Sequence, residues 1–161
     1  DDAYQKIMAM LDGRGVRIAV DATRDLLMKV LPYHPFLIKP NNHELGEMFG
    51  TVCKTDEDIV HYAKKLQEKG AVNVLISMAG DGAILITEDG QNIRMGTPKG
   101  KVVNSVGAGD SMVAGFITGY IRGGNYEEAL KSGTAAGSAT AFSEGLASLE
   151  MYEKMLKQIT E

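Results

Sequence analysis

The residues of this chain that are best placed to do chemistry lie in the segment 102–116. A turn, Gly107-Ala108-Gly109, precedes Asp110, and apolar residues at helical spacing follow from Met112 onward. The backbone N–H groups of that turn would open a helix, where the first donors lack an intrahelical acceptor and the dipole attracts anions. An anion site that also holds a carboxylate able to act as a base suits phosphoryl transfer.

The same residues have a plainer interpretation, which the residues alone leave open. Glycines before a helix often form only a tight turn, and an acid in the first helical turn often only stabilises the helix dipole. Two other nucleotide-binding patterns are excluded. Met112 stands where a G-x-G-x-x-G pattern needs its third glycine, and the chain has no G-x-x-x-x-G-K-[ST] loop.

The segment Asn104–Phe116 resembles the signature of the ribokinase family of carbohydrate kinases, also called the phosphofructokinase-B family. Many members have Asp-Thr where this chain has Asn104-Ser105, and the pair found here is similar to the branch that phosphorylates fructose 1-phosphate or tagatose 6-phosphate. The resemblance implies that Asp110 is the catalytic base. It also implies that the amides of Gly107, Ala108 and Gly109 stabilise the moving phosphoryl group, and that Gly109 contacts ATP.

A second candidate segment, Lys39 to Glu44, stands where a predicted strand ends and a helix begins. Asn41-x-x-Glu44 resembles the Asn-x-x-Glu motif of the same family, which implies that both residues handle Mg²⁺ and phosphate through water. A helix cap, with Asn41 at the N-cap and Glu44 three residues later, explains the same pair. The resemblance implies that Lys39 neutralises phosphate, and the alternative is a lysine that only ends a strand.

A third candidate segment runs from Ser77 to Gly82 and follows another predicted strand. It resembles the Ser-x-Gly-x-x-Gly stretch of the family, which implies that Ser77, Gly80 and Gly82 approach the nucleotide phosphates. The match is imperfect, because Ala79 holds the central glycine position and Gly80 comes one place later. A simple turn between two strands is the other interpretation.

Helix and strand patterns alternate along the chain, which predicts a mostly parallel sheet with helices on both faces. A late hairpin around Glu88-Asp89-Gly90 makes the sheet mixed. The resemblance implies the three-layer, ribokinase-like α/β fold. Strands are predicted over 16–21, 36–39, 72–77, 83–87 and 92–95, and helices over 2–12, 24–31, 41–49, 55–69, 108–122, 126–142 and 148–160.

Composition excludes several function classes. The formal net charge of −4, without a basic cluster, argues against nucleic-acid binding. The longest apolar run, 112–121, is too short to cross a bilayer. Cys53 is the only cysteine, so no internal disulfide can form, which favours a reducing cytoplasm. The histidines and Cys53 show no spacing typical of a structural metal site.

The resemblance covers residues 1–161 as the second half of a longer family domain. We therefore expect the C-terminal nucleotide-binding portion of a carbohydrate kinase, without the half that carries the lid and most sugar contacts. The implied reaction is transfer of phosphate from ATP, with Mg²⁺, to a hydroxyl of fructose 1-phosphate, giving fructose 1,6-bisphosphate. The alternatives are tagatose 6-phosphate as substrate, or nucleotide binding without catalysis. A homodimer formed through the lid is a further expectation.

Overall fold

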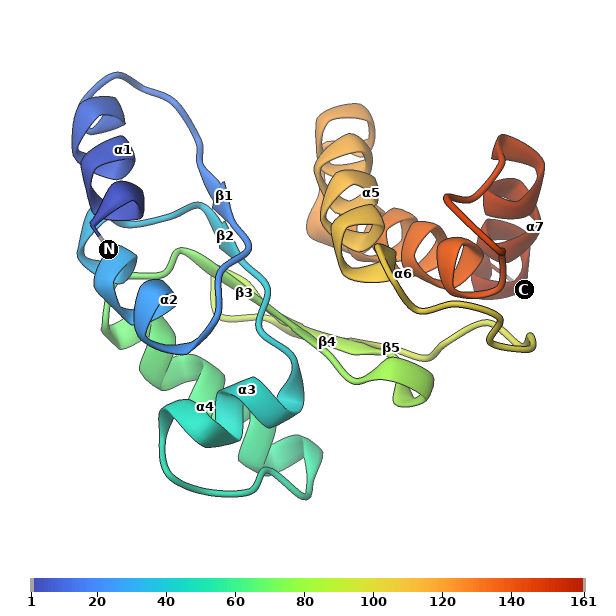
Figure 1. Cartoon of the computed structure of the whole chain (residues 1–161), viewed down its shortest axis with the longest axis horizontal. Helices are drawn as coiled ribbons and strands as arrows, with labels where there is room; N and C mark the ends of the chain where they lie inside the picture. Colours follow the sequence, from blue (N-terminus) through green and yellow to red (C-terminus); the bar gives the residue numbers. More distant parts are fainter. Residues whose placement is uncertain (1, 161) are drawn as a thin grey trace. The chain divides into compact units, whose positions relative to one another are not determined.

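The computed structural model describes residues 2–160, and they divide into two compact units (Figure 1). Unit 1 contains the chain up to Ser77 together with Ile84–Asn92. Unit 2 contains Met78–Ala83 together with the chain from Ile93 onward. The chain therefore passes between the units more than once.

Nearly all predicted helices and strands are present. The first part of the chain forms α1 (Ala3–Leu11), β1 (Ala19–Val20), α2 (Arg24–Val30), the 3₁₀ turn η1 (Leu31–Tyr33), β2 (Leu37–Ile38), α3 (Asn42–Met48), α4 (Asp56–Glu68) and β3 (Asn73–Ser77). The later part forms the 3₁₀ turn η2 (Ala79–Asp81), β4 (Ala83–Ile86), β5 (Asn92–Met95), α5 (Ala108–Gly123), α6 (Tyr126–Ala141) and α7 (Leu149–Thr160).

The strands form one five-stranded sheet in the order β1-β2-β3-β4-β5. β1, β2 and β3 are parallel, with Leu37 opposite both Ala19 and Asn73. The connections from β3 to β4 and from β4 to β5 are only a few residues long, so these neighbours run antiparallel. The sheet is therefore mixed, which confirms the prediction from the alternating pattern and the late hairpin.

The first strand is shorter than predicted, since only Ala19 and Val20 of the expected range 16–21 form it. Among the described strands β1 pairs only with β2, so the residues of 16–21 that do not lie opposite β2 cannot join the sheet through it. Val16 is exposed, and the Arg17 guanidinium lies over the Phe36 ring, 5.0 Å from its centroid. The prediction of a strand over 16–21 is therefore wrong outside Ala19–Val20.

The core of unit 1 lies around β3, where Val74, Leu75 and Ile76 are completely buried. A continuous apolar strand of this kind is typical of a sheet covered on both faces. α4 packs against β3 through its buried side chains Ile59, Ala63 and Leu66. This packing fixes the end of β3, at Ser77, where the candidate site begins.

Capping boxes start α3 and α4, as the spacing of their polar residues predicts. In α4 the Asp58 carboxylate accepts hydrogen bonds from the N–H groups of Lys54 and Thr55, at 2.9 and 3.1 Å. The Thr55 hydroxyl in turn accepts the N–H of Asp58 at 3.1 Å. The two backbone donors favour the ionised carboxylate, so the pKa of Asp58 lies below its ordinary value.

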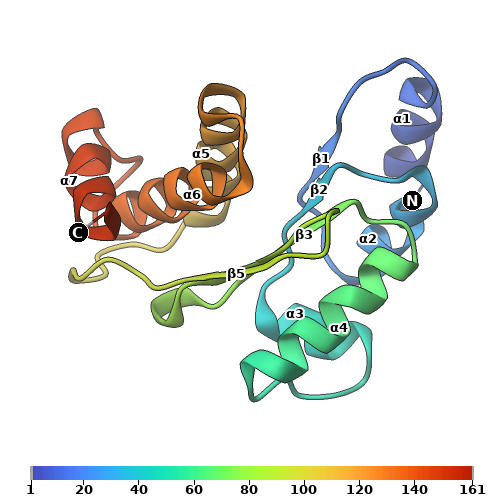
Figure 2. The ribbon, with the colours of Figure 1, turned by 180° about the vertical axis from the view of Figure 1, so that it is seen from behind.

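In unit 2, α6 lies between α5 and α7 (Figure 2). The α5–α6 contact is close because glycines face it from both helices. A β-carbon at Gly115 or Gly119 would lie 2.7 Å from the carbonyl oxygen of Ser132 or Glu128, respectively. From the other side, a β-carbon at Gly137 would lie 3.1 Å from the carbonyl oxygen of Ala108. The glycines at 133 and 137 therefore serve helix packing.

The first prediction concerns this contact. Gly119→Ala should lower the free energy of unfolding by about 1–3 kcal/mol, because the added methyl group meets backbone that cannot move freely. Helix propensity alone would favour alanine by about 1 kcal/mol, so a net loss is diagnostic of the contact. Urea unfolding followed by circular dichroism measures it. Gly96→Ala is the control, because a β-carbon there meets nothing within 4 Å.

The second prediction concerns the α4 capping box and pH. A lowered pKa means that the Asp58 carboxylate stabilises the fold above its unfolded pKa of about 3.9, and that this stability is lost as pH falls through the lower folded value. Asp58→Asn should therefore reduce the urea midpoint at pH 7 and much less at pH 3. Glu57→Gln removes a charge from the same turn without breaking the cap. An equal pH response in both variants would contradict the assignment.

Candidate active site

The N-terminal end of α5 carries the glycine turn singled out in the sequence. Gly107 is the N-cap and has φ 79°, in the left-handed region that glycine adopts without strain. The first helical hydrogen bond runs from the N–H of Ser111 to the carbonyl of Gly107, at 2.9 Å. The N–H of Ala108 is already donated to the carbonyl of Ser105, at 3.2 Å. Within residues 2–160, the N–H groups of Gly107, Gly109 and Asp110 have no acceptor, and those of Gly109 and Asp110 lie in the first turn of the helix.

Asp110 is the third residue of α5, and its side chain is exposed. Its carboxylate forms no hydrogen bond or ion pair with the part of the chain that the structure describes. A carboxylate locked in a buried salt bridge could not act as a base, and Asp110 is not in that state. Of the three amides expected to face an anion, those of Gly107 and Gly109 have no acceptor within residues 2–160, whereas that of Ala108 is engaged.

In unit 1 the structure brings Asn41, Glu44 and Ser77 together at the carboxyl ends of β2 and β3. Asn41 and Ser77 form a parallel bridge, and the Ser77 N–H donates to the carbonyl of Pro40 at 3.2 Å. Parallel strands of α/β sheets collect ligands at this edge. Ser77 is half-buried and thus keeps part of its side chain accessible.

Asn41 and Glu44 form the capping box of α3. The Asn41 side chain accepts the N–H of Glu44, and one carboxylate oxygen of Glu44 accepts the N–H of Asn41, both at 2.8 Å. The interpretation of these residues as a helix cap is confirmed. The cap uses Oε2 of Glu44, and the second oxygen, Oε1, has no partner within residues 2–160. A ligand role for Glu44 is therefore compatible with the cap.

Lys39 follows β2 directly and is 8% exposed. Its ammonium lies 3.3 Å from the carboxylate of Asp21, which follows β1. Lysines are almost never this buried unless they are paired, so Asp21 holds the cation at the carboxyl ends of the strands. Asp21 belongs to none of the predicted site segments. In the sequence it is marked only as an acid that ends the predicted strand 16–21, while Lys39 ends the predicted strand 36–39.

The segment after β3 belongs to unit 2 and forms a tight turn, in which the N–H of Met78 donates to the carbonyl of Gly82 at 2.8 Å. Ala79 has φ 48°, a left-handed conformation that favours glycine. Gly82 has φ 94°, and a β-carbon there would overlap the carbonyl oxygen of Met95. A β-carbon at Gly80 meets nothing within 4 Å, so nothing there requires glycine.

The backbone explains the imperfect match of this segment. The family pattern has glycine at the position of Ala79, and the structure has the left-handed conformation at that position. The turn of this chain therefore has, at Ala79, a conformation that favours glycine although the residue is an alanine. Gly82 fits the pattern in both residue and conformation.

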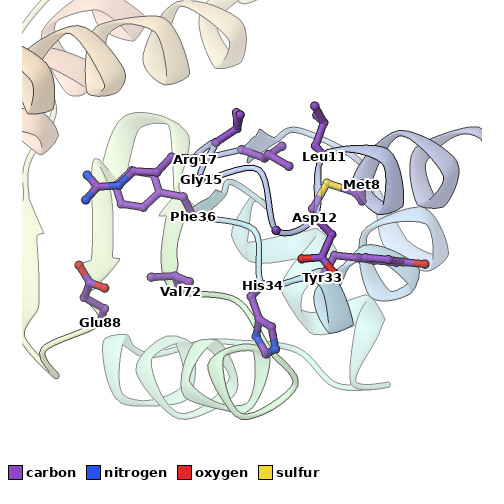
Figure 3. A pocket seen from close by; sticks show the side chains of 13 residues that line it. Met8, Leu11, Asp12, Gly15, Arg17, Tyr33, His34, Phe36, Val72 and Glu88 are labelled. Atoms are coloured by element: carbon purple, nitrogen blue, oxygen red, sulfur yellow. The ribbon is translucent and has the colours of Figure 1, made fainter.

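A cavity of about 320 Å³ in unit 1 lies away from these residues (Figure 3). It lies at the opposite edge of the sheet, where Arg17, Phe36 and Val72 precede β1, β2 and β3. Met8 and His34 also line it, and the His34 ring nitrogen Nδ1 lies 3.0 Å from the carbonyl oxygen of Gly70. None of the predicted site residues lines this cavity.

Other chemistries find little support in the described residues. No three His, Cys, Asp or Glu side chains within 2–160 gather closely enough to hold a metal ion. Burial raises the pKa of the Cys53 thiol, with a smaller contribution from Asp58, so the reactive thiolate is disfavoured. None of the helices between residues 2 and 160 has the length and apolarity that crossing a bilayer requires.

Comparison with known proteins identifies the family to which this chain belongs. Residues 1–151 match the pfkB family of carbohydrate kinases, and the chain is a member of that family. The resemblance seen at residues 104–116 is thereby confirmed, as is the ribokinase-like α/β fold.

Particular relatives agree with this assignment. The chain is 48% identical over 158 residues to a 1-phosphofructokinase of Bacillus subtilis, covering 98% of the chain and 52% of the relative. It is 37% identical to a D-tagatose-1-phosphate kinase of Bacillus licheniformis, covering 99% of the chain and 52% of the relative. Phosphofructokinase-2 of Escherichia coli, solved with substrates and products, superposes with a TM-score of 0.88 at 26% identity, covering 98% and 53%. The chain thus spans about half the length of these relatives.

The third prediction tests the turn after β3. Gly82→Ala should destabilise the protein by about 2 kcal/mol or more, because its backbone conformation and the Met95 carbonyl both exclude a side chain. Ala79→Gly should be neutral or stabilising, since relief of about 1–2 kcal/mol of left-handed strain offsets the greater freedom of glycine in the unfolded chain. Thermal unfolding compares the two variants. A marked loss of stability in Ala79→Gly would contradict the strain.

Proposed function

We propose that residues 1–161 form the C-terminal, nucleotide-binding portion of an ATP-dependent kinase that phosphorylates a sugar phosphate. The observation that carries the proposal is Asp110, an exposed carboxylate without a partner, in the same helical turn as two unused N–H groups. Membership of the pfkB family supports this assignment. So do the relatives named as sugar-phosphate kinases.

In the proposed reaction Asp110 accepts the proton of the substrate hydroxyl. The hydroxyl oxygen forms a bond to the γ-phosphorus while the bond to the leaving ADP oxygen breaks. The N–H groups of Gly109 and Asp110 donate to the phosphoryl oxygens as charge develops on them. One such donor contributes about 3 kcal/mol in other enzymes. Little covalent chemistry is asked of the protein, so positioning and charge stabilisation carry the catalysis.

The other predicted site residues would bind the nucleotide. Lys39 supplies a positive charge for the phosphates, and Ser77, Gly80 and Gly82 offer backbone and hydroxyl contacts. Mg²⁺ bound to ATP supplies further charge neutralisation, and it prefers oxygen ligands while keeping several waters. The free Oε1 of Glu44 suits contact through water, and Asn41 holds that carboxylate in place.

Fructose 1-phosphate is the substrate we propose, with fructose 1,6-bisphosphate as product, because the B. subtilis relative is named 1-phosphofructokinase. The B. licheniformis relative favours tagatose 1-phosphate as the second candidate, beside the tagatose 6-phosphate expected from the sequence. The homodimer through the lid and the cytoplasmic location stay predictions. Binding of ATP without turnover is the outcome expected for residues 1–161 alone.

The test of this function uses a chimera in which residues 1–161 replace the aligned segment of the B. subtilis 1-phosphofructokinase. Release of ADP is measured with fructose 1-phosphate, tagatose 1-phosphate and tagatose 6-phosphate. Turnover with fructose 1-phosphate supports the proposal. A folded chimera that binds ATP but releases no ADP with any of the three overturns it.

The fourth prediction concerns the base. In the chimera, Asp110→Asn should lower kcat roughly 100- to 10,000-fold while the affinity for ATP stays nearly constant, because only proton transfer is lost. Glu127→Gln is the matched control, since Glu127 is also an exposed acid in the first turn of a helix. A variant at Asp110 that keeps a tenth of the wild-type kcat would remove the residue from this role.

A further inference from the structure

The C-terminal end of α6 is bonded to both sides of the turn that carries Asp110. The carbonyl of Ala141 accepts the N–H groups of Val103 and Asn104, at 2.8 and 3.1 Å. The Asn104 side chain accepts the N–H of Val106 at 3.0 Å and donates to the carbonyl of Glu144 at 3.2 Å. These bonds hold the start of the turn. They do not hold the other end of the turn, where the unused N–H groups of Gly109 and Asp110 lie.

A buried hydroxyl holds that other end. Thr140 is 1% exposed, and its hydroxyl donates to the hydroxyl oxygen of Ser111 at 2.8 Å. Ser111 follows Asp110 directly and makes the first hydrogen bond of α5. The N–H of Ala147 approaches the same Thr140 oxygen at 3.4 Å, which orients the hydroxyl proton toward Ser111. Thr140 therefore fixes the helical turn that contains the two unused amides.

We propose that Thr140 is a positioning residue for phosphoryl transfer: through Ser111, its hydroxyl sets the place of Asp110 and of the N–H groups of Gly109 and Asp110. This inference rests on the proposed function. Thr140 acts through Ser111 and needs no contact with substrate. Misplacement of reacting groups by about 1 Å can cost about 100-fold in rate, so one buried hydrogen bond can matter for kcat.

The same helix offers a matched control. Thr134 is also on α6 and also 1% exposed, but its hydroxyl has no hydrogen-bond partner among residues 2–160. Replacing either threonine by valine keeps the shape of the side chain and removes one buried hydroxyl. The two variants thus differ in whether the lost hydroxyl had partners: that of Thr140 holds Ser111 and is approached by the N–H of Ala147, and that of Thr134 has none among residues 2–160.

The experiment measures kcat, KM and thermal unfolding in the chimera for Thr140→Val, Thr140→Ser and Thr134→Val. We expect Thr140→Val to lower kcat about tenfold or more, with KM for ATP and for sugar phosphate nearly unchanged. Thr140→Ser keeps the hydroxyl and should restore kcat, and Thr134→Val should match the wild type. Ser111→Ala should lower kcat as Thr140→Val does. The double variant should lower kcat no further, because both substitutions remove the same hydrogen bond.

A second measurement is independent of activity. In the 161-residue chain itself, amide hydrogen exchange at Ser111, whose N–H donates to the carbonyl of Gly107, should be faster in Thr140→Val than in Thr134→Val. Equal kcat in the two valine variants, or equal exchange at this amide, overturns the positioning role. A wild-type chimera without kinase activity overturns the proposed function instead, and the exchange comparison then still decides whether Thr140 holds the turn.

Discussion

The close contact between α5 and α6 is the constraint on which unit 2 depends. Glycines on both helices allow the two backbones to come into contact. This contact runs from Gly119 on α5 to Gly137 on α6, and Gly137 faces Ala108, the first residue of α5. Because protein interiors are close-packed, such a contact leaves the helix little freedom to slide. The start of α5 is thereby held against the end of α6. The hydrogen bonds of Thr140 and Ala141 form at this end of the contact between the helices.

The N-caps of α3 and α5 both lie at predicted site residues. Asn41 and Glu44 satisfy each other's backbone N–H groups, and the bond to the Asn41 N–H holds one carboxylate oxygen of Glu44 just after the end of β2. At α5 the opposite arrangement holds: Gly107 offers no side chain to cap the helix, so the N–H groups of Gly109 and Asp110 have no acceptor within residues 2–160. The start of α3 is capped by its own side chains, and the start of α5 has no side-chain cap, as is typical of helix N-termini that bind anions.

Local signals made most elements and the two helix starts predictable. The spacing of Asn41 and Glu44 predicted the cap, and the glycines before Asp110 predicted an open helix N-terminus. The length of β1 was not predictable, because it depends on which residues β2 can reach. Thr140 could not be found either: its partner is 29 residues earlier, and a threonine among small helical residues carries no local pattern. Ala79 concealed a left-handed conformation that glycine would have revealed.

Neither unit is a continuous stretch of chain. Met78–Ala83 belongs with the helices of unit 2, whereas the residues that follow, Ile84–Asn92, return to unit 1. A truncation beginning at Ile93 would therefore discard the segment containing Gly82, against which Met95 lies. Cleavage at one junction would likewise leave the other crossings intact. Any attempt to dissect this protein must follow its interlaced connectivity, not a single boundary in the sequence.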